Sequence, residues 1–474
     1  MKKLIVSFLA LIVAGPAAAQ TPDSLQLSLE AAVERALEVG DEVLLARAQV
    51  DLAGAQVTTA RAAGLPQLRL SSTYNHVFEN ARANAVGQIF NQPNTYNTNA
   101  NLSQAIFQGG RIFAGARAAG RLLNAARLNA EEARNQAAYD VQRAYLQALF
   151  AQQLTDIQDA NLELADAQLR QVSLFEQSGR AARYDVLRAR VQRANIEPQA
   201  IQARGDLDVA LLELKRLANV PAATPIKLTT RLTPENVEAT VVGLIDDPTG
   251  IDARPSVQAA EFMARARRDA IRVARADLLP SITFFVQSGY QAFPRANVFP
   301  WERGRLAPEF CPEGSTATSC QNGGWFPDRS LGVQLSWPLF DGLRVKGNID
   351  AAQAQARIAE LQLAQEREAV ALEVEQARAN LQRARSLFAA RRENAAEANE
   401  AFRLVSLRFN RGLSTQLDVS DTQIALLTAR TNEARAIYDL YLAGAELARA
   451  QGKPIPLPVT SPTEPRRTIG TVIP

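Results

Sequence analysis

The sequence contains few of the residue types from which most catalytic and metal-binding sites are built. Its 474 residues include one histidine, two cysteines and two methionines. Zinc sites, histidine-based catalytic relays and iron–sulfur clusters need more of these side chains than the chain contains. We also find no nucleophile elbow, no metal-ligand spacing and no glycine loop of the phosphate-binding type. The sequence therefore predicts a protein that is not an enzyme and that binds neither a metal ion nor a cofactor.

Other features that the sequence lacks narrow the class of protein further. With 25 glycines and 23 prolines, the chain has too few turn-forming residues for an all-β protein, so long helices are expected. The net charge of +3 is too small to indicate a nucleic-acid partner. After the N-terminal segment there is no run of about 18 apolar residues, so we predict no membrane-spanning helix.

The N-terminus has the three parts of a secretory signal peptide. Lys2 and Lys3 form a basic segment, Leu4–Val13 is apolar, and Ala17–Ala19 provides a cleavage site of small residues. We predict that residues 1–19 are removed on secretion. A buried N-terminal helix is the alternative.

The rest of the chain repeats itself. Leu-Pro at 65–66 recurs at 279–280, and the glycine and aspartate at 179 and 185 recur at 412 and 418. A repeat of this length predicts a duplicated architecture rather than a short solenoid unit. The expected segments are a first repeat at 20–218, a joining segment at 219–255, a second repeat at 256–452 and a C-terminal tail at 453–474.

Each repeat has the same predicted order of elements. A helix ends at Leu-Pro, two strands follow, and then come a very long helix (about 111–177 or 344–410), a glycine turn and a return helix (about 184–218 or 415–450). A long helix of this kind would extend about 100 Å. Its apolar residues follow a heptad pattern, which favours paired antiparallel coiled coils. A plain coiled-coil rod is the alternative that this pattern alone leaves open.

Four segments alternate between apolar and polar residues, at about 67–78, 95–107, 281–292 and 329–340. This alternation fits a transmembrane barrel, and it fits a half-buried soluble sheet equally well. Four strands cannot close a barrel, and lipid cannot pair their edges, so a membrane location would require several copies of the chain. A pore for a sizeable solute favours three copies.

An insertion at 293–328 separates the third and fourth strands. We expect it to form the largest external loop. Cys311 and Cys320 lie within it, and a disulfide between them is plausible in a secreted protein. The alternative is that both cysteines are free thiols.

The turn motifs connect the chain to a known family. FNRGLSTQLDVSD at 409–421 and FEQSGRAARYDV at 175–186 occur at one offset within the duplicated order of elements. In this the chain resembles the TolC-like outer membrane efflux proteins over nearly all of its mature length. The resemblance implies a mixed α and β membrane protein. Its homotrimer would form a 12-stranded outer-membrane β-barrel, four strands per chain, continued by a 12-helix periplasmic α-barrel.

The resemblance also implies a function and partners. Such a trimer is the passive exit duct of a tripartite efflux or type I secretion system, embedded in outer-membrane lipid. A periplasmic adaptor protein would dock at the turns around Gly179, Gly412 and Leu413, and an inner-membrane transporter of RND, ABC or MFS type would supply the energy. A periplasmic or surface coiled-coil protein with a structural or adhesive role is the alternative.

The same resemblance places a gate at the periplasmic end. Asp418 and Asp421 match positions that line the narrowest point, where three chains would form an acidic ring that favours cations. Crowding would raise the pKa of some of these carboxylates. Without the resemblance, Asp418 and Asp421 would be interpreted as solvated acids near a helix start, where a negative charge interacts favourably with the helix dipole.

Closure of the tip is implied at four positions: Tyr184, Asp185, Phe409 and Ser414. Phe409 has no phenolic donor and Ser414 has no cationic one, so the links of the family's best-known member cannot all form here. Asp185 then needs another partner, and we hypothesise a nearby arginine. The candidates are Arg183, Arg408 and Arg411.

Overall fold

The computed structural model describes residues 25–79, 81, 85, 94–230, 233, 237, 251–293 and 325–453. The chain divides into two compact units. We call residues 1–44, 133–249 and 372–474 the helical unit, and residues 45–132 and 250–371 the sheet unit. The predicted signal peptide, the cysteine pair and most of the C-terminal tail lie outside the described residues.

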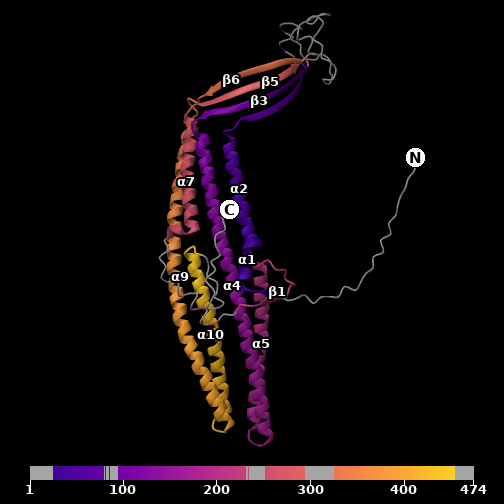
Figure 1. Cartoon of the computed structure of the whole chain (residues 1–474), viewed down its shortest axis with the longest axis vertical. Helices are drawn as coiled ribbons and strands as arrows, with labels where there is room; N and C mark the ends of the chain where they lie inside the picture. Colours follow the sequence, from indigo (N-terminus) through magenta and orange to yellow (C-terminus); the bar gives the residue numbers. More distant parts are fainter. Residues whose placement is uncertain are drawn as a thin grey trace, which may run out of the picture. The chain divides into compact units, whose positions relative to one another are not determined.

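The sheet unit contains one four-stranded antiparallel sheet (Figure 1). Its strands are β2 (Gln67–His76), β3 (Asn94–Gln108), β5 (Ser281–Ala292) and β6 (Trp325–Ser336), in the order β2-β3-β5-β6. Each repeat supplies one hairpin, and the two hairpins join where β3 pairs with β5. Strands β2 and β6 are the two edges of this sheet.

The register gives the sheet one apolar and one polar face. Leu68 pairs with Leu102, Leu102 with Val286, and Val286 with Leu331. Side chains of directly paired residues lie on the same face, so these four apolar residues form a row across the sheet. The neighbouring row is polar throughout, and it consists of Arg69, Asn101, Gln287 and Ser330.

The fourth strand differs from the expectation. It was predicted at 329–340, and it begins four residues earlier at Trp325 and ends at Ser336. Pro338 has no backbone N–H and cannot continue the ladder, although the apolar alternation continues through Trp337 and Leu339. Both side chains are exposed beyond the end of the strand.

Glycines form the junctions between strands and long helices. α4 (Arg111–Gln177) begins after Gly109, whose φ is +59°, and α9 (Arg344–Asn410) begins after Gly342, whose φ is +69°. A Cβ on Gly109 would lie 2.6 Å from the carbonyl oxygen of Ala276, so no larger residue fits there. In the second repeat Leu343 also has a positive φ, +70°.

The helices that precede the strands are α2 (Asp41–Ala62) and α7 (Pro255–Arg275). Within the sheet unit, α4 is tied to α7 by ion pairs. The Arg121 guanidinium lies 2.9 Å from the carboxylate of Asp269, which is buried, and Arg111 pairs with Asp277.

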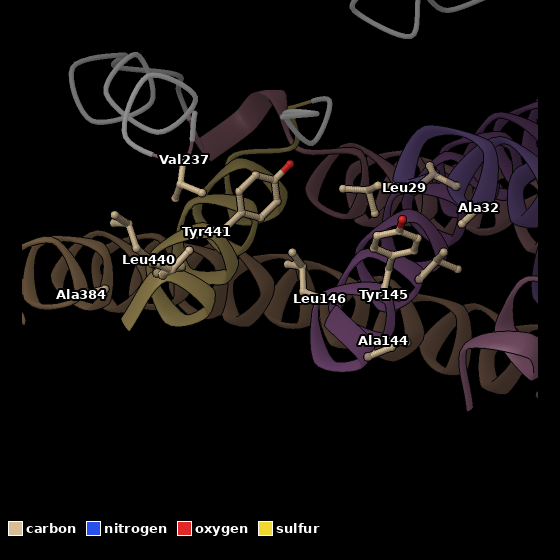
Figure 2. Packing of buried hydrophobic residues seen from close by; sticks show 14 of the residues in the cluster. Leu29, Ala32, Ala144, Tyr145, Leu146, Val237, Ala384, Leu440 and Tyr441 are labelled. Carbon is tan, nitrogen blue, oxygen red and sulfur yellow. The ribbon is translucent and has the colours of Figure 1, made fainter. Parts of the chain in front are cut away.

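The helical unit is built on the heptad positions. It combines β1 (Leu25–Leu27), α1 (Leu29–Val39), β4 (Ile226–Leu228), α5 (Arg183–Leu217) and α10 (Gln416–Ala450) with parts of α4 and α9. Some of the apolar heptad residues are buried in one cluster, part of which Figure 2 shows. Its members from the two long helices include Val141, Ala144, Ala148, Ala377, Leu381, Ala384 and Phe388.

Tyr145 ties the peripheral segments to this core. Its ring is fully buried in the cluster (Figure 2), and its hydroxyl donates to the Leu27 carbonyl oxygen at 2.8 Å. The same hydroxyl accepts from the backbone N–H of Thr230 at 3.2 Å. One side chain thus bonds to the last residue of β1, whose carbonyl oxygen also accepts from the Thr229 N–H, and to the backbone just after β4.

Among the described residues, no helix has the length and hydropathy that crossing a lipid bilayer requires.

We predict that Tyr145→Phe lowers the free energy of unfolding by about 1–3 kcal/mol, because the Thr230 N–H loses its partner and the Leu27 carbonyl oxygen keeps only the N–H of Thr229. Hydrogen exchange at β1 and β4 measures the loss locally, and chemical denaturation measures it for the whole chain. Tyr438→Phe is the matched control. Tyr438 is half-buried, and its hydroxyl forms no hydrogen bond with the described residues, so the substitution removes a hydroxyl without removing a bond. Equal effects of the two substitutions would contradict the assigned role.

Candidate functional site: the helical hairpin tips

Two tight turns join the long helices to the return helices. Gly179 and Gly412 have φ values of +72° and +75°, and each ends its long helix. The N–H of Arg180 donates to the carbonyl oxygen of Phe175 at 2.7 Å, and the N–H of Leu413 donates to that of Arg408 at 2.8 Å. Both turns therefore have the same glycine-terminated helix cap. A Cβ on either glycine would have open space around it, so the backbone conformation alone requires glycine there.

The two turns contact each other through aromatic rings. The rings of Phe175 and Phe409 have centroids 6.3 Å apart and are tilted by 43°. Beside them the Gln171 side-chain amide donates to the Asn410 side-chain oxygen at 2.8 Å. Phe409, which the sequence marked as lacking a phenolic donor, thus makes a ring contact, and the polar link is formed one residue further along.

Asp418 caps its own helix. Its carboxylate accepts from the backbone N–H of Thr415 at 2.8 Å and from the Thr415 hydroxyl at 2.9 Å. The backbone N–H of Asp418 donates to that hydroxyl in return, at 3.3 Å, which completes a capping box. These hydrogen bonds favour the ionised form and hold the pKa of Asp418 below its ordinary value.

Both candidate gate aspartates face away from the core of their own chain. Asp418 and Asp421 are exposed, whereas Val419, Ser420 and Gln423 on the opposite side of α10 are buried. The upward pKa shift expected of an acidic ring is a property of several chains together. The single chain gives Asp418 the opposite shift, because its carboxylate accepts two hydrogen bonds at the helix start.

Asp185 has the equivalent place at the start of α5. Its carboxylate accepts from the backbone N–H of Ala182 at 3.1 Å, but Ala182 has no hydroxyl to return the bond. Within the described part of the chain, no ion pair joins Asp185 to any arginine. The hypothesised partners Arg183, Arg408 and Arg411 therefore form no ion pair with it in the single chain. Tyr184 is exposed and Ser414 is half-buried.

A polar seam links the two helical hairpins further from the turns. The Ser420 hydroxyl of α10 donates to Gln192 of α5 at 2.6 Å, and the Gln192 amide reaches Gln423 at 3.4 Å. The Gln423 amide in turn donates to Asn161 of α4 at 2.7 Å. Asn161, Ser420 and Gln423 are all buried. Four polar side chains thus connect three helices where heptad packing alone would place apolar residues.

One feature of the sequence indicates this polar seam, although the heptad pattern alone does not. Ser420 and Gln423 are three positions apart on one face of α10, between apolar residues on the buried side. Buried polar groups need partners, so polar residues on a buried stripe indicate a network. Their partners on α4 and α5 are far away in sequence, and only the structure identifies them.

Within the described residues, no group of three or more histidine, cysteine, aspartate or glutamate side chains is placed to hold a metal ion.

Comparison with known proteins gives one family. The profile of the family described as "Outer membrane efflux protein" matches residues 32–220 and 251–453. Nodulation protein T of Rhizobium leguminosarum bv. trifolii is 25% identical over 411 residues, which cover 86% of this chain and 81% of that protein. Outer membrane protein TolC of Vibrio cholerae serotype O1 is 25% identical over 434 residues, which cover 88% of this chain and 89% of that protein.

The fold has solved counterparts. The crystal structure of the Campylobacter jejuni CmeC outer membrane channel superposes with a TM-score of 0.75 at 17% identity, covering 90% of this chain and 85% of that one. The predicted fold of long coiled-coil helices plus four antiparallel strands per chain is thereby confirmed.

The capping box makes the start of α10 sensitive to acid. Because the pKa of Asp418 is lowered in the folded chain, its carboxylate stabilises the helix start fully above the ordinary aspartate pKa. This stabilisation is lost as the pH falls through the lowered value. We predict that Thr415→Val raises the pKa of Asp418, measured by a carboxyl-carbon NMR titration. Thr422→Val is the control, since the Thr422 hydroxyl donates to backbone carbonyls and not to the carboxylate. An unchanged Asp418 titration in Thr415→Val would contradict the capping assignment.

Proposed function

Because the chain belongs to the outer membrane efflux protein family, we propose that three copies of it form the passive exit duct of a tripartite export system. As a family member it is a transport protein and not an enzyme. It is an outer-membrane channel with a large periplasmic helical part. In this proposal a periplasmic adaptor joins the duct to an inner-membrane transporter of RND, ABC or MFS type.

The observation that supports the duct best is the two-faced sheet. An apolar face suits lipid and a polar face suits a water-filled lumen. The polar face has a row of amide side chains, and it contains Asn97, Asn99, Asn101, Gln287 and Gln291. A coiled-coil rod does not require a sheet with one apolar and one polar face. The sheet therefore favours the duct over a coiled-coil protein with a structural or adhesive role.

The open edges of the sheet support assembly with other copies. Backbone groups along β2 and β6 have no partner strand on their outer sides within the described sheet, and lipid cannot replace one. The helices next to these edges also expose apolar residues. Leu45 and Leu52 of α2 and Ile358 and Leu361 of α9 are all more than half exposed. Pairing of β6 with β2 of a neighbouring copy would bring α9 against α2 and cover all four.

Three copies give the proposed channel its size. Twelve strands enclose a wider lumen than the eight that two copies would provide. The polar face of each sheet would line this lumen.

The proposed gate is a ring of Asp418 and Asp421 from the three copies. Both carboxylates face away from the hairpin core of their own chain, as lumen-facing groups must. An acidic constriction favours cations and repels anions. The hydrogen bonds that lower the pKa of Asp418 favour its ionised form, which opposes the upward shift that crowding by the other chains would cause.

The polar seam is the device that we propose holds this gate closed within each chain. Widening the ring requires the α9–α10 hairpin to move away from the α4–α5 hairpin. That movement breaks the bonds of Gln423 to Asn161 and of Ser420 to Gln192. The side chains of this network can hydrogen-bond to one another when the hairpins are together, or to water when the hairpins separate. The network therefore suits a two-state gate.

The hairpin turns are the proposed adaptor-docking surface. The Gly179 and Gly412 turns are exposed, and Leu413 presents an apolar side chain to solvent beside the second. Specificity for cargo belongs to the transporter, because a passive duct need only admit the solute.

We predict that Asp418→Ala/Asp421→Ala enlarges single-channel conductance in planar bilayers and reduces preference for cations, because the acidic ring is removed. The purified wild type is expected to run as a trimer and to give a small, cation-preferring conductance. Asp206→Ala/Asp208→Ala on α5 is the charge-matched control, and we expect it to leave conductance unchanged.

The outcomes separate the parts of this proposal. A conducting trimer that ignores the gate substitutions would keep the duct and exclude the acidic ring. A folded trimer that never conducts would exclude the duct and restore the coiled-coil rod.

We predict that Gln423→Met increases the open fraction of the channel several-fold, because Asn161 and Gln192 lose their shared partner while the side-chain volume is kept. Gln416→Met is the control on the same helix. Gln416 is also buried, but neither of its side-chain polar atoms has a hydrogen-bond partner in the single chain. Its replacement removes no such bond and should leave the conductance as it is. The same increase in both variants would exclude the polar seam as the closing device.

A further inference from the structure

The sheet unit contains an arginine-lined groove between α2 and α4 that the duct does not explain. Its lining includes Val57 and Arg61 of α2 and Phe113, Arg117 and Arg127 of α4. We propose that this groove binds the phosphate headgroup of an anionic phospholipid in the periplasmic leaflet of the outer membrane. The proposal rests on the outer-membrane location and is independent of the gate.

The side chains that line the groove carry positive charge only. Four of them are arginines, Arg61, Arg117, Arg121 and Arg127, and none is acidic. Arg111 and Arg121 form ion pairs with α7 and the turn after it. For Arg61, Arg117 and Arg127, all exposed, the described residues provide no carboxylate partner. Three free guanidinium groups along one groove attract phosphate, which they can bind bidentately.

The position of Phe113 indicates that the groove faces lipid rather than the lumen. Its side chain is 77% exposed and lies on α4 three residues after Gly110, just beyond the end of β3. Other large apolar side chains are exposed at the same ends of the strands. They are Leu65, Ile106, Trp337, Leu339 and Phe340. Exposed aromatic and apolar residues at this level are typical of the membrane–water boundary and would be unfavourable in a water-filled lumen.

Arg117 lies at headgroup depth on the same face. It is one helical turn, about 6 Å along the axis, from Phe113. Arg61 on α2 is in the turn that precedes Leu65 and lines the same groove. An acyl chain against Phe113 would therefore place its phosphate between Arg61 and Arg117.

The second repeat provides an internal comparison. At the offset that aligns the repeats, Asp350 takes the place of Arg117 and Glu360 that of Arg127. Glu360 there pairs with Arg268 at 2.8 Å. At 275, the position that matches Arg61, the second repeat also has an exposed arginine, so among the three free arginines only the two α4 positions differ in charge between the repeats. A requirement of the scaffold therefore does not account for Arg117 and Arg127.

The test uses the purified full-length protein in detergent containing equal amounts of phosphatidylglycerol and phosphatidylcholine with the same acyl chains. Native mass spectrometry then reports which lipid stays bound. We expect the wild type to retain phosphatidylglycerol preferentially. Arg61→Gln/Arg117→Gln should lower this preference about 25-fold, since each arginine near an anionic headgroup contributes about fivefold. Arg61→Lys/Arg117→Lys, which keeps the charge, should retain most of it.

The control removes two positive charges from the corresponding face of the second repeat, by Arg275→Gln/Arg357→Gln, and should keep the preference. Equal retention of both lipids by the wild type, or equal loss in both Gln variants, would overturn the proposal. Displacement of the lipid by millimolar inorganic phosphate, but not by chloride of matched ionic strength, would show a site for free anions and would overturn it too. Unchanged bilayer conductance of Arg61→Gln/Arg117→Gln would show that the duct is intact while the lipid site is lost.

Discussion

Hydrocarbon offers no hydrogen-bond partner to a peptide group, and this constraint decides most of the architecture. A sheet that enters lipid must have every strand paired, yet each chain contributes four strands with open edges at β2 and β6. In the proposed duct, further copies of the chain pair with these edges. The helices attached to the edges would continue the wall outside the membrane, and their exposed apolar residues would pack against the same neighbours.

The two repeats provide equivalent helices and strands. Positions at which the repeats differ indicate residues with a role beyond the shared fold. The turns at Gly179 and Gly412 have the same backbone geometry, but only the second is followed by a threonine that completes a capping box with its aspartate. Near the sheet, Arg117 and Arg127 of the first repeat stand where the second has Asp350 and Glu360. The differences between equivalent positions therefore show where a residue does more than maintain the scaffold.

Much of this fold could be predicted from the sequence, because its signals are local. The Leu-Pro breaks, the strand alternation and the heptads each depend on neighbouring residues, and they give the element order that the structure has. The predicted fourth strand lies four residues too far along the chain, because the apolar alternation continues through Trp337 and Leu339, which lie beyond the end of the strand. The polar seam could not be located, since Gln423 bonds to helices remote in sequence. The downward shift of the Asp418 pKa depends on the geometry of the capping box with Thr415, which the sequence does not show. The acidic gate stays a prediction.

The pairing of β3 with β5 also has a consequence for the order in which the chain folds. Gln108 pairs with Ser281, and the whole first helical hairpin lies between them in sequence. Each β-hairpin and each helical hairpin consists of local contacts and can form early, whereas the central strand pair must wait for the second half of the chain. Until then each repeat has one small two-stranded ribbon with an apolar face. Contact order therefore predicts that the sheet is completed after the hairpins form, and the unpaired strand edges of that interval favour aggregation.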